Sequence, residues 1–240
     1  MGTETLVVDA LSINLLAAAA VLALVHTVLG PDHTLPFIML GRAQKWTSRR
    51  TLLVTFLCGL GHVLSSLLLG GVGLALGYGV AHVTKAEEIR GDLAAWALVA
   101  FGAAYLVWGV RHAIRTRQGI VPHDHHGHVH LHTQGDHEHA HAGPERSRTT
   151  FWALFVVFVL GPCEPLIPLF VLPASRGRWE LAALTALVFS VVTIATMVTL
   201  VAVALAGVRR LPLAALERWS HAMAGGVIAA SGLAVIFLGL

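Results

Sequence analysis

The chain has 240 residues, of which 56% are hydrophobic and only 12% are charged. A soluble domain of this length carries about 25% charged residues, so the composition excludes an ordinary soluble globular protein. The net charge of +3 comes from Lys and Arg that flank apolar segments, which argues against a nucleic-acid-binding protein.

Six segments of the chain are apolar enough to cross a membrane, which takes about 20 residues in a helix. They are residues 11–41, 51–80, 92–112, 150–175, 181–208 and 220–240. They predict an all-α polytopic membrane protein, because β-barrel strands would be shorter and would alternate in polarity. The first segment follows an N-terminus without basic residues and is too long for a signal peptide, so we expect an uncleaved helix.

Lys and Arg are distributed unequally over the loops between six such helices. All of the 16 except Lys85, Arg90, Arg176 and Arg178 fall on one side. Cytoplasmic loops carry the excess of these residues. We therefore expect a cytoplasmic (inner) membrane protein with both termini outside and the central loop inside.

Two halves, residues 1–112 and 150–240, flank a central loop at residues 113–149. An offset of about 131 aligns Leu29-Gly30-Pro31 with Leu160-Gly161-Pro162. The same offset pairs Asp32 with Cys163, His33 with Glu164, His62 with Thr193 and Ser65 with Thr196. Three helices in each half predict inverted repeats, which many transporters use. A duplication that serves only packing is the alternative.

Gly30-Pro31 and Gly161-Pro162 are predicted helix breaks near the middle of the first and fourth segments. Proline has no N–H, so the carbonyl four residues earlier loses its helical partner. Pro165 would free the carbonyl of Gly161 in this way. Broken backbone at membrane depth is tolerated where it is buried in protein or lines a cavity. A simple proline kink is the structural alternative.

His26, Asp32 and His33 surround the first break. Two imidazoles and a carboxylate suit divalent ions such as Ni²⁺, Co²⁺ or Zn²⁺. Ionisable residues inside a membrane are costly and usually functional. His62, which follows two glycines in the second segment, is a further candidate ligand, or else an interhelical hydrogen-bonding residue.

Cys163 and Glu164 occupy the second break. Cys163 is either a soft ligand or a packing residue, whereas Cys58 is expected to pack, and two cysteines make no disulfide framework. A buried Glu164 needs a partner or a proton. It would balance the charge of the metal, accept protons or pair with an imidazole.

Hydroxyl side chains offer a polar path at Ser65, Thr193 and Thr196, with Ser190 and Thr199 on a similar face. Bonds from these hydroxyls to carbonyls of their own helix are the alternative. His82, His112 and His221 lie near the ends of segments and are expected at the membrane interface.

The central loop carries a tract at residues 123–141 in which acidic residues alternate with nine of the 15 histidines. These are His123, His125, His126, His128, His130, His132, His137, His139 and His141. This composition predicts auxiliary metal binding in a segment that is disordered without metal. An essential and a dispensable role in transport are both compatible with it.

Asp32-His33 after His26, followed by Leu60-Gly61-His62, resembles the nickel/cobalt transporter superfamily, whose hallmark is His-x4-Asp-His on an early helix. Here five residues separate His26 from Asp32. The form GPDHTLPF is more similar to the urease-accessory and nickel/cobalt-efflux types than to the eight-span permeases. The second break also faintly resembles thiol-reducing membrane proteins of cytochrome c maturation.

We therefore expect a transporter of Ni²⁺ or Co²⁺, not an enzyme, in which His26, Asp32, His33 and His62 form the site and Glu164 and Cys163 complete it. Ligands release protons when they bind metal, so proton coupling is a natural hypothesis. No permanently bound cofactor is expected. The implied partners are the bilayer, the metal and a cytoplasmic metallochaperone or nickel-enzyme assembly protein. The alternatives are thiol–electron transfer, export of another solute, or a tethered metal sensor.

Overall fold

The computed structural model describes residues 10–117, 121–125, 128–132, 144–161, 163–208 and 214–238. The first half contains α1 (Ala10–Leu29), the 3-10 helix η1 (Pro31–His33), α2 (Leu35–Ala43), α3 (Ser48–Ala75) and α4 (Val80–Arg117). A hairpin of β1 (Val121–His125) and β2 (His128–His132) follows. The second half contains α5 (Pro144–Leu160), α6 (Leu166–Ser175), α7 (Trp179–Val208), η2 (Ala214–Trp219) and α8 (Ser220–Leu238).

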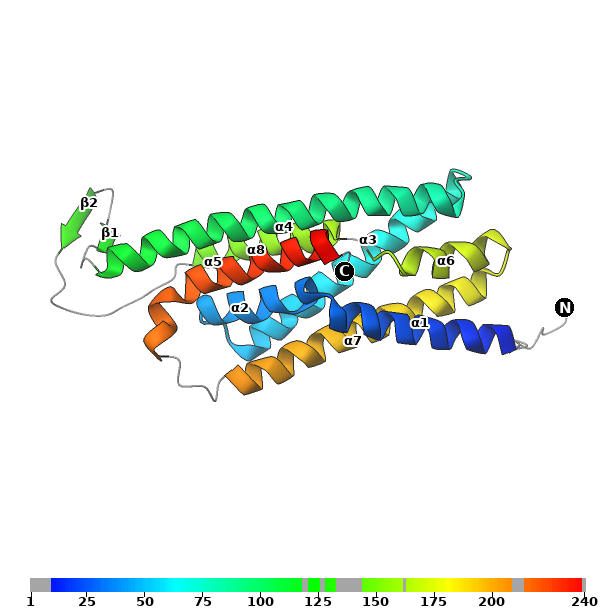
Figure 1. The fold of residues 1–240 in the computed structure, drawn as a ribbon, viewed down its shortest axis with the longest axis horizontal. Helices are drawn as coiled ribbons and strands as arrows, with labels where there is room; N and C mark the ends of the chain where they lie inside the picture. The colour runs from blue at the N-terminus through cyan, green and yellow to red at the C-terminus, as the bar shows by residue number, and fades with distance from the viewer. Residues whose placement is uncertain are drawn as a thin grey trace.

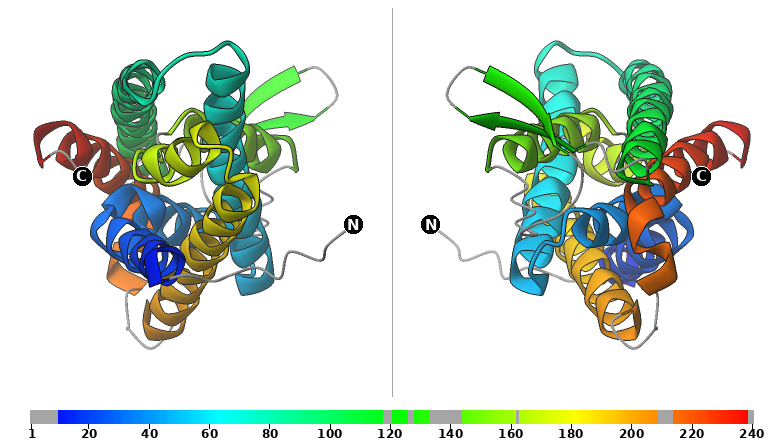
Figure 2. Two further views of the ribbon diagram at one scale, coloured as in Figure 1. Left: turned by 90° about the vertical axis from the view of Figure 1, so that its right-hand side faces the viewer. Right: turned by 90° about the vertical axis from the view of Figure 1, so that its left-hand side faces the viewer.

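The helices lie roughly along one long axis and form an elongated bundle (Figures 1 and 2). The path from α1 to α2 leads toward the end that carries the hairpin, and α3 runs back. The path from α5 to α6 leads away from the hairpin, opposite to α1 and α2 (Figure 1). The path from α1 to α2 and the path from α5 to α6 therefore run in opposite directions.

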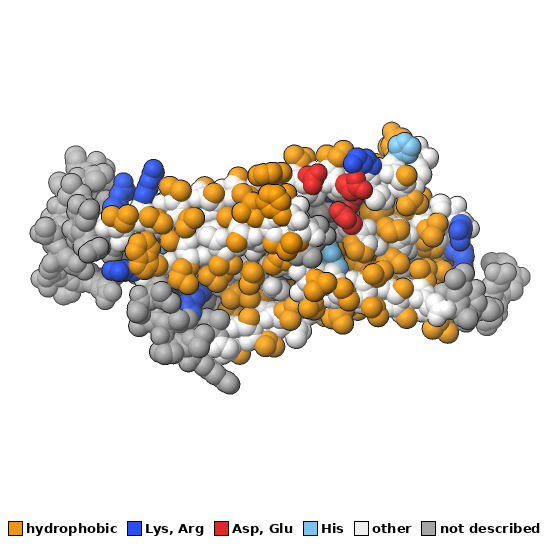
Figure 3. Space-filling model, in the orientation of Figure 1, with side chains coloured by type: hydrophobic (Ala, Val, Ile, Leu, Met, Phe, Trp, Pro, Cys, Tyr) orange, Lys and Arg blue, Asp and Glu red, His pale blue; other side chains and the backbone are white. Residues whose placement is uncertain are grey.

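Within the described residues, five helices are long and apolar enough to cross a membrane, at Ser12–Leu29, Ser48–Ala75, Val80–Arg115, Trp179–Gly207 and Glu217–Leu238. The fourth predicted segment is instead divided into two shorter apolar helices, Thr149–Leu160 and Leu166–Ser175. Large apolar side chains such as Leu68, Leu93 and Val203 are more than 60% exposed, and apolar atoms cover much of the visible surface (Figure 3). The protein is an α-helical, multi-pass membrane protein.

Both Gly-Pro sequences coincide with interruptions of a helix. α1 ends at Leu29, and Pro31 begins η1 after Gly30, which has extended backbone. α5 ends at Leu160, and α6 begins only at Leu166. The prediction of two breaks is confirmed at Gly30, Pro31 and Gly161, whereas Pro162 lies outside the described residues.

Glycines permit unusually close contact between α4 and α8. A Cβ atom on Gly102 would collide with the backbone of Ala229, and one on Gly225 would collide with the backbone of Leu106. The same is true of Gly109 against Ala222. This contact joins the last helix of the first half to the last helix of the second.

The connection between the halves is shorter than residues 113–149, because α4 continues to Arg117 and α5 begins at Pro144. Within this connection β1 and β2 pair in antiparallel register, with His125 opposite His128. The composition of the histidine-rich tract predicts no regular structure in the absence of metal. The described part of the tract, residues 123–125 and 128–132, instead belongs to two strands. Its histidines alternate with other residues, which fits the two-residue period of a strand.

Candidate metal centre

Three histidines from three elements meet at the first helix break. The ring centroid of His33, in η1, lies 4.7 Å from that of His26 in α1 and 5.2 Å from that of His62 in α3. The rings of His26 and His62 are stacked at 6.4 Å. The break brings His26 and His33 together, because it turns the chain between them. The prediction that these residues form one cluster with His62 agrees with this geometry.

The Nε2 atoms of all three imidazoles are buried, and none has a hydrogen-bond partner among the described residues. His33 and His62 are each only 2% exposed. A buried polar atom without a partner costs about 1–3 kcal/mol, so such atoms are rare unless they serve a function. A neutral imidazole nitrogen with a free lone pair is the usual histidine ligand for a metal.

The opposite ring nitrogens of His33 and His62 face acceptors. Nδ1 of His33 lies 3.0 Å from Oδ1 of Asp32, and Nδ1 of His62 lies 3.4 Å from the carbonyl oxygen of Phe158. An Nδ1–H that donates to an acceptor leaves the lone pair on Nε2. Metal-binding histidines are commonly oriented by this kind of second contact. Asp32 thus provides an acceptor for the His33 tautomer that suits a ligand.

Cys163 joins the cluster from the second half of the chain. One ligand atom each of His26, His62 and Cys163 lies within 4.8 Å of the other two. Ligands of a tetrahedral ion, bound at about 2.0–2.3 Å, stand about 3.5 Å apart, so small side-chain rotations would enclose an ion. The thiol of Cys163 is buried, and Cys163 packs with Val63 and Leu166. The geometry is compatible with both interpretations of Cys163, since this residue packs in an apolar cluster and lies within reach of a shared ion with His26 and His62.

The break glycines lie directly against the imidazoles. A Cβ atom on Gly30 would collide with Nδ1 of His33 and Oδ1 of Asp32. A Cβ atom on Gly161 would lie 3.3 Å from Nδ1 of His62. Both glycines therefore provide space for the side chains of the cluster.

A pocket reaches the cluster between η1, α3, α4, α5 and α8. Asp32, His62, Gly91, Phe158 and Gly161 are among the residues that line it. The side chain of Asp32 is 24% exposed, whereas that of His33 is 3% exposed. The carboxylate of Asp32 is therefore accessible from the pocket, whereas the imidazole of His33 is not.

Glu164 does not join this cluster. Its side chain is exposed, and its electrostatic neighbours are Glu88, Glu87 and Asp92. Acidic side chains gather on this face of the molecule (Figure 3). The position of Glu164 in the second break, where the repeat also aligns it with His33, predicts that it completes the site. Consecutive residues of the short turn point in different directions, so Cys163 faces inward and Glu164 outward.

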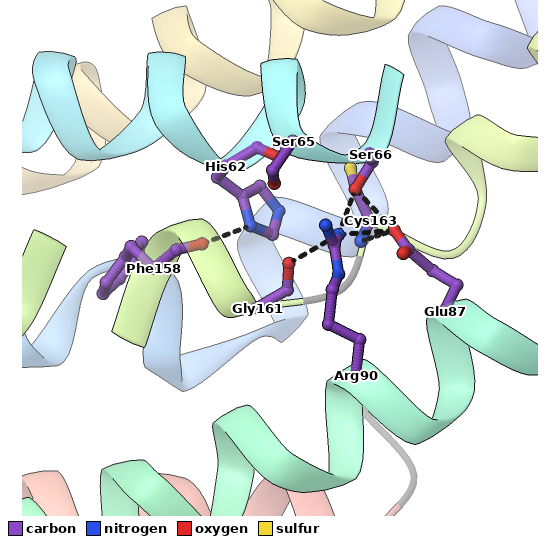
Figure 4. Close-up of polar contacts among 8 residues, drawn as sticks. All are labelled: His62, Ser65, Ser66, Glu87, Arg90, Phe158, Gly161 and Cys163. Atoms are coloured by element: carbon purple, nitrogen blue, oxygen red, sulfur yellow. Dashed lines mark hydrogen bonds and ion pairs between the residues drawn. The ribbon is translucent and has the colours of Figure 1, made fainter. Parts of the chain in front are cut away.

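Glu87 and Arg90 of α4 form a polar network beside the cluster that the sequence analysis missed (Figure 4). Arg90 Nη2 lies 2.7 Å from Oε1 of the fully buried Glu87. It also lies 2.6 Å from Ser66 Oγ and 3.0 Å from the carbonyl oxygen of Gly161. The predicted third segment began at residue 92, which assigned both residues to a loop. Their opposite charges three residues apart are typical of a helix and were the available signal.

The side-chain contacts give little support to the predicted polar path. Ser65 donates to the carbonyl of His62 and Ser190 to that of Ala186, so both hydroxyls bond to their own helix. Thr193 Oγ1 is buried without a partner in the described part of the chain. Thr196 is half-buried in α7.

The remaining candidates lie away from the cluster. Cys58 packs in an apolar group with Phe37 and Phe158, as expected. His82 stacks on Tyr78. His221 accepts from or donates to the Tyr105 hydroxyl at 2.8 Å, and its ring centroid lies 5.9 Å from that of His112.

The histidine-rich tract is described only in part. His123 and His125 belong to β1, and His128, His130 and His132 belong to β2. His126, His137, His139 and His141 lie outside the described residues. The prediction of auxiliary metal binding by this tract therefore stays a prediction.

Comparison of the chain with protein-family models, with curated proteins and with solved structures finds no match.

Proposed function

We propose that this protein transports a divalent transition-metal cation across a membrane, with Ni²⁺ or Co²⁺ as the preferred cargo. The observation that carries the proposal is the set of three buried Nε2 atoms that have no hydrogen-bond partner in the described part of the chain, at a helix break in a membrane protein. Imidazole nitrogens suit Ni²⁺, Co²⁺ and Zn²⁺ alike, and a cysteine thiolate favours the softer of these ions. Membrane proteins rarely retain such groups for packing.

The arrangement of the two halves supports transport rather than storage. The ends of α1 and α5 at the two breaks lie in the middle part of the bundle, and the two broken paths run in opposite directions (Figure 1), which supports a comparison with transporters built from inverted repeats. We propose six membrane crossings, with α1 to α2 and α5 to α6 as the two broken ones. Movement of one half against the other would expose the site to each side in turn.

Each residue would have a distinct role in the transport cycle. Asp32 would attract the cation in the pocket and orient His33. His26, His33, His62 and Cys163 would replace the water bound to the ion. Since thiol and imidazole ligands must be deprotonated, binding releases protons and makes exchange of metal for protons the natural coupling. Glu164 would act at the exposed acidic face rather than in the site.

The excess of Lys and Arg in the loops on one side supports a cytoplasmic central loop in an inner membrane. The histidine-rich tract would then bind metal inside the cell. It would collect ions for export, or exchange them with a cytoplasmic metallochaperone or nickel-enzyme assembly protein. Both directions of transport are compatible with the arrangement.

Thiol–electron transfer ranks below metal transport. A dithiol relay needs two cysteines that can meet, whereas Cys58 and Cys163 pack in separate apolar clusters. Three buried imidazoles would have no role in such a relay. Substitution of Cys58 by Ser should therefore leave transport intact.

Flux of Ni²⁺ or Co²⁺ into proteoliposomes tests the proposal. The variant His33→Ala should lose at least about tenfold in flux, because loss of a ligand or its support costs about 10- to 100-fold in metal binding. His82→Ala is the matched control, since His82 is exposed and stacks only on Tyr78 among the described rings. Equal flux through wild type and His33→Ala would refute the proposal.

A further inference from the structure

The polar network between α4 and the second helix break does more than neutralise a buried charge. Glu87 Oε1 accepts the backbone N–H of Cys163 at 3.1 Å, and Arg90 Nη2 donates to the carbonyl of Gly161 at 3.0 Å. One carboxylate and one guanidinium thus bond to backbone groups on both sides of the break (Figure 4).

The break leaves both of these backbone groups without helical partners. Pro165 has no N–H to donate to the carbonyl of Gly161, four residues earlier. The N–H of Cys163 precedes α6, where the first amides of a helix have no intrahelical acceptor. The Glu87–Arg90 pair therefore replaces the missing helical hydrogen bonds at this point in the chain.

The same pair also contacts α3, the helix that carries His62. Ser66 Oγ donates to Glu87 Oε1 and lies 2.6 Å from Arg90 Nη2. Ser66 follows His62 by four residues and so lies on the same face of α3. One ion pair on α4 is thereby attached to the helix of His62 and to the amide of Cys163.

We propose that Glu87 and Arg90 are positioning residues of the metal centre, which hold Cys163 at binding distance from His26 and His62. This inference rests on the proposed function. The three ligands come from α1, α3 and the second break, and no covalent link shorter than a hundred residues joins Cys163 to His62. Glu87 is fully buried and the Arg90 side chain is 16% exposed. Removal of either charge would therefore leave the other charge unpaired in an apolar interior.

Co²⁺ binding to the purified full-length protein tests this inference, because cobalt reports its ligands by colour. Wild type should show a thiolate-to-cobalt charge-transfer band that Cys163→Ser removes. Glu87→Gln should weaken Co²⁺ binding by about 10- to 100-fold and remove the same band, as expected for a residue that orients a ligand. Glu88→Gln, which affects an exposed pair with Lys85, is the matched control and should bind as wild type.

A double-mutant cycle separates positioning of Cys163 from general destabilisation. In the Cys163→Ser background, Glu87→Gln should change Co²⁺ affinity by less than about threefold, because coupled effects do not add. An undiminished effect of Glu87→Gln in that background would overturn the inference. Ser66→Ala, which leaves no buried charge unpaired, should show the same pattern more weakly and replaces Glu87→Gln if that variant does not fold.

Alkylation of Cys163 without metal provides a second readout, in protein with Cys58→Ala. The Cys163 side chain is fully buried. Arg90→Gln removes the charged donor to the carbonyl of Gly161 and should make the backbone at the break more mobile. A membrane-permeant maleimide should then label Cys163 at least about tenfold faster. Equal labelling of the Arg90→Gln variant and its parent would overturn the inference even if metal transport is demonstrated. Failure of the wild-type protein to bind Co²⁺ or Ni²⁺ would instead refute the proposed function itself.

Discussion

At the level of single residues, His33 differs from His26 and His62 in having a carboxylate beside it. Asp32 Oδ1 and His33 Nδ1 lie 3.0 Å apart, and the Asp32 side chain is accessible from the pocket while His33 is not. A carboxylate in this position orients the imidazole and raises its basicity as a ligand. Under the proposed function, Asp32 would combine two roles, attraction of the cation and orientation of a ligand.

The variant Asp32→Asn should separate the charge of this residue from its hydrogen bond. The amide oxygen can still accept from His33 Nδ1–H, but the negative charge is lost. We expect Ni²⁺ affinity to fall by about tenfold, in the range seen for second contacts of metal ligands. Isothermal titration calorimetry on detergent-solubilised protein measures this change.

Asp92→Asn serves as the control for Asp32→Asn, because Asp92 is exposed on α4. Removal of this charge should leave Ni²⁺ affinity near the wild-type value. Wild-type affinity in Asp32→Asn would show instead that the carboxylate contributes no charge to the site.

At the level of helices, the two Gly-Pro breaks are similar in sequence, but the hydrogen bonds of their backbone groups are made differently. The first is short and places Asp32 and His33 in η1. The second is longer and depends on Glu87 and Arg90 from α4 for its backbone hydrogen bonds. The repeat predicted two breaks, but it did not predict that one of them needs side chains from another helix.

The contact between α4 and α8 should be highly sensitive to side-chain size. Gly225→Ala would drive a Cβ atom into the backbone of Leu106. Separation of the two helices should cost about 1–3 kcal/mol, as overpacking commonly does. A lower Tm in detergent, measured by the loss of circular dichroism, is the expected result.

The neighbouring Gly226 provides a control for this substitution. A Cβ atom there would meet only Leu106 Cδ1, at 4.0 Å. Gly226→Ala should therefore keep or raise the Tm, because Ala is favoured over Gly within a helix by about 1 kcal/mol. A similar Tm for both variants would contradict the close contact at Gly225.

For the whole molecule, the centre of the bundle and the histidine-rich tract are separate parts of the chain. The three imidazoles of the cluster come from α1, η1 and α3, and none comes from residues 123–141. The hairpin lies at one end of the long axis (Figure 1). Metal binding by the tract and metal binding in the bundle should thus be independent.

Replacement of all nine histidines in residues 123–141 by Ser tests this independence. We expect flux in proteoliposomes to stay within about twofold of wild type, as for sites that do not interact. The number of Ni²⁺ ions bound per protein should fall. A variant in which His26, His33 and His62 are replaced instead should lose flux and keep the ions bound by the tract. Loss of flux in the first variant would show that the tract is needed for transport.

Much of this architecture follows from local sequence. Long apolar segments must form helices in a membrane, because helices satisfy every backbone hydrogen bond internally. The paired Gly-Pro sequences, which carry polar residues directly after them, predicted the position of both breaks, whereas single glycines such as Gly59 and Gly102 lie inside continuous helices. The gathering of His26 and His33 at one break also follows from spacing, since a broken helix brings residues on its two sides together.

Tertiary packing decides which residues belong to the candidate site. The orientation of Cys163 toward the imidazoles and of Glu164 toward the surface is set by a short turn, which the repeat alignment does not describe. The role of Glu87 and Arg90 is visible only when α4 lies beside the second break. Periodicity and residue type report on local structure, whereas a site assembled from α1, α3, α4 and the second break depends on contacts between residues far apart in the chain.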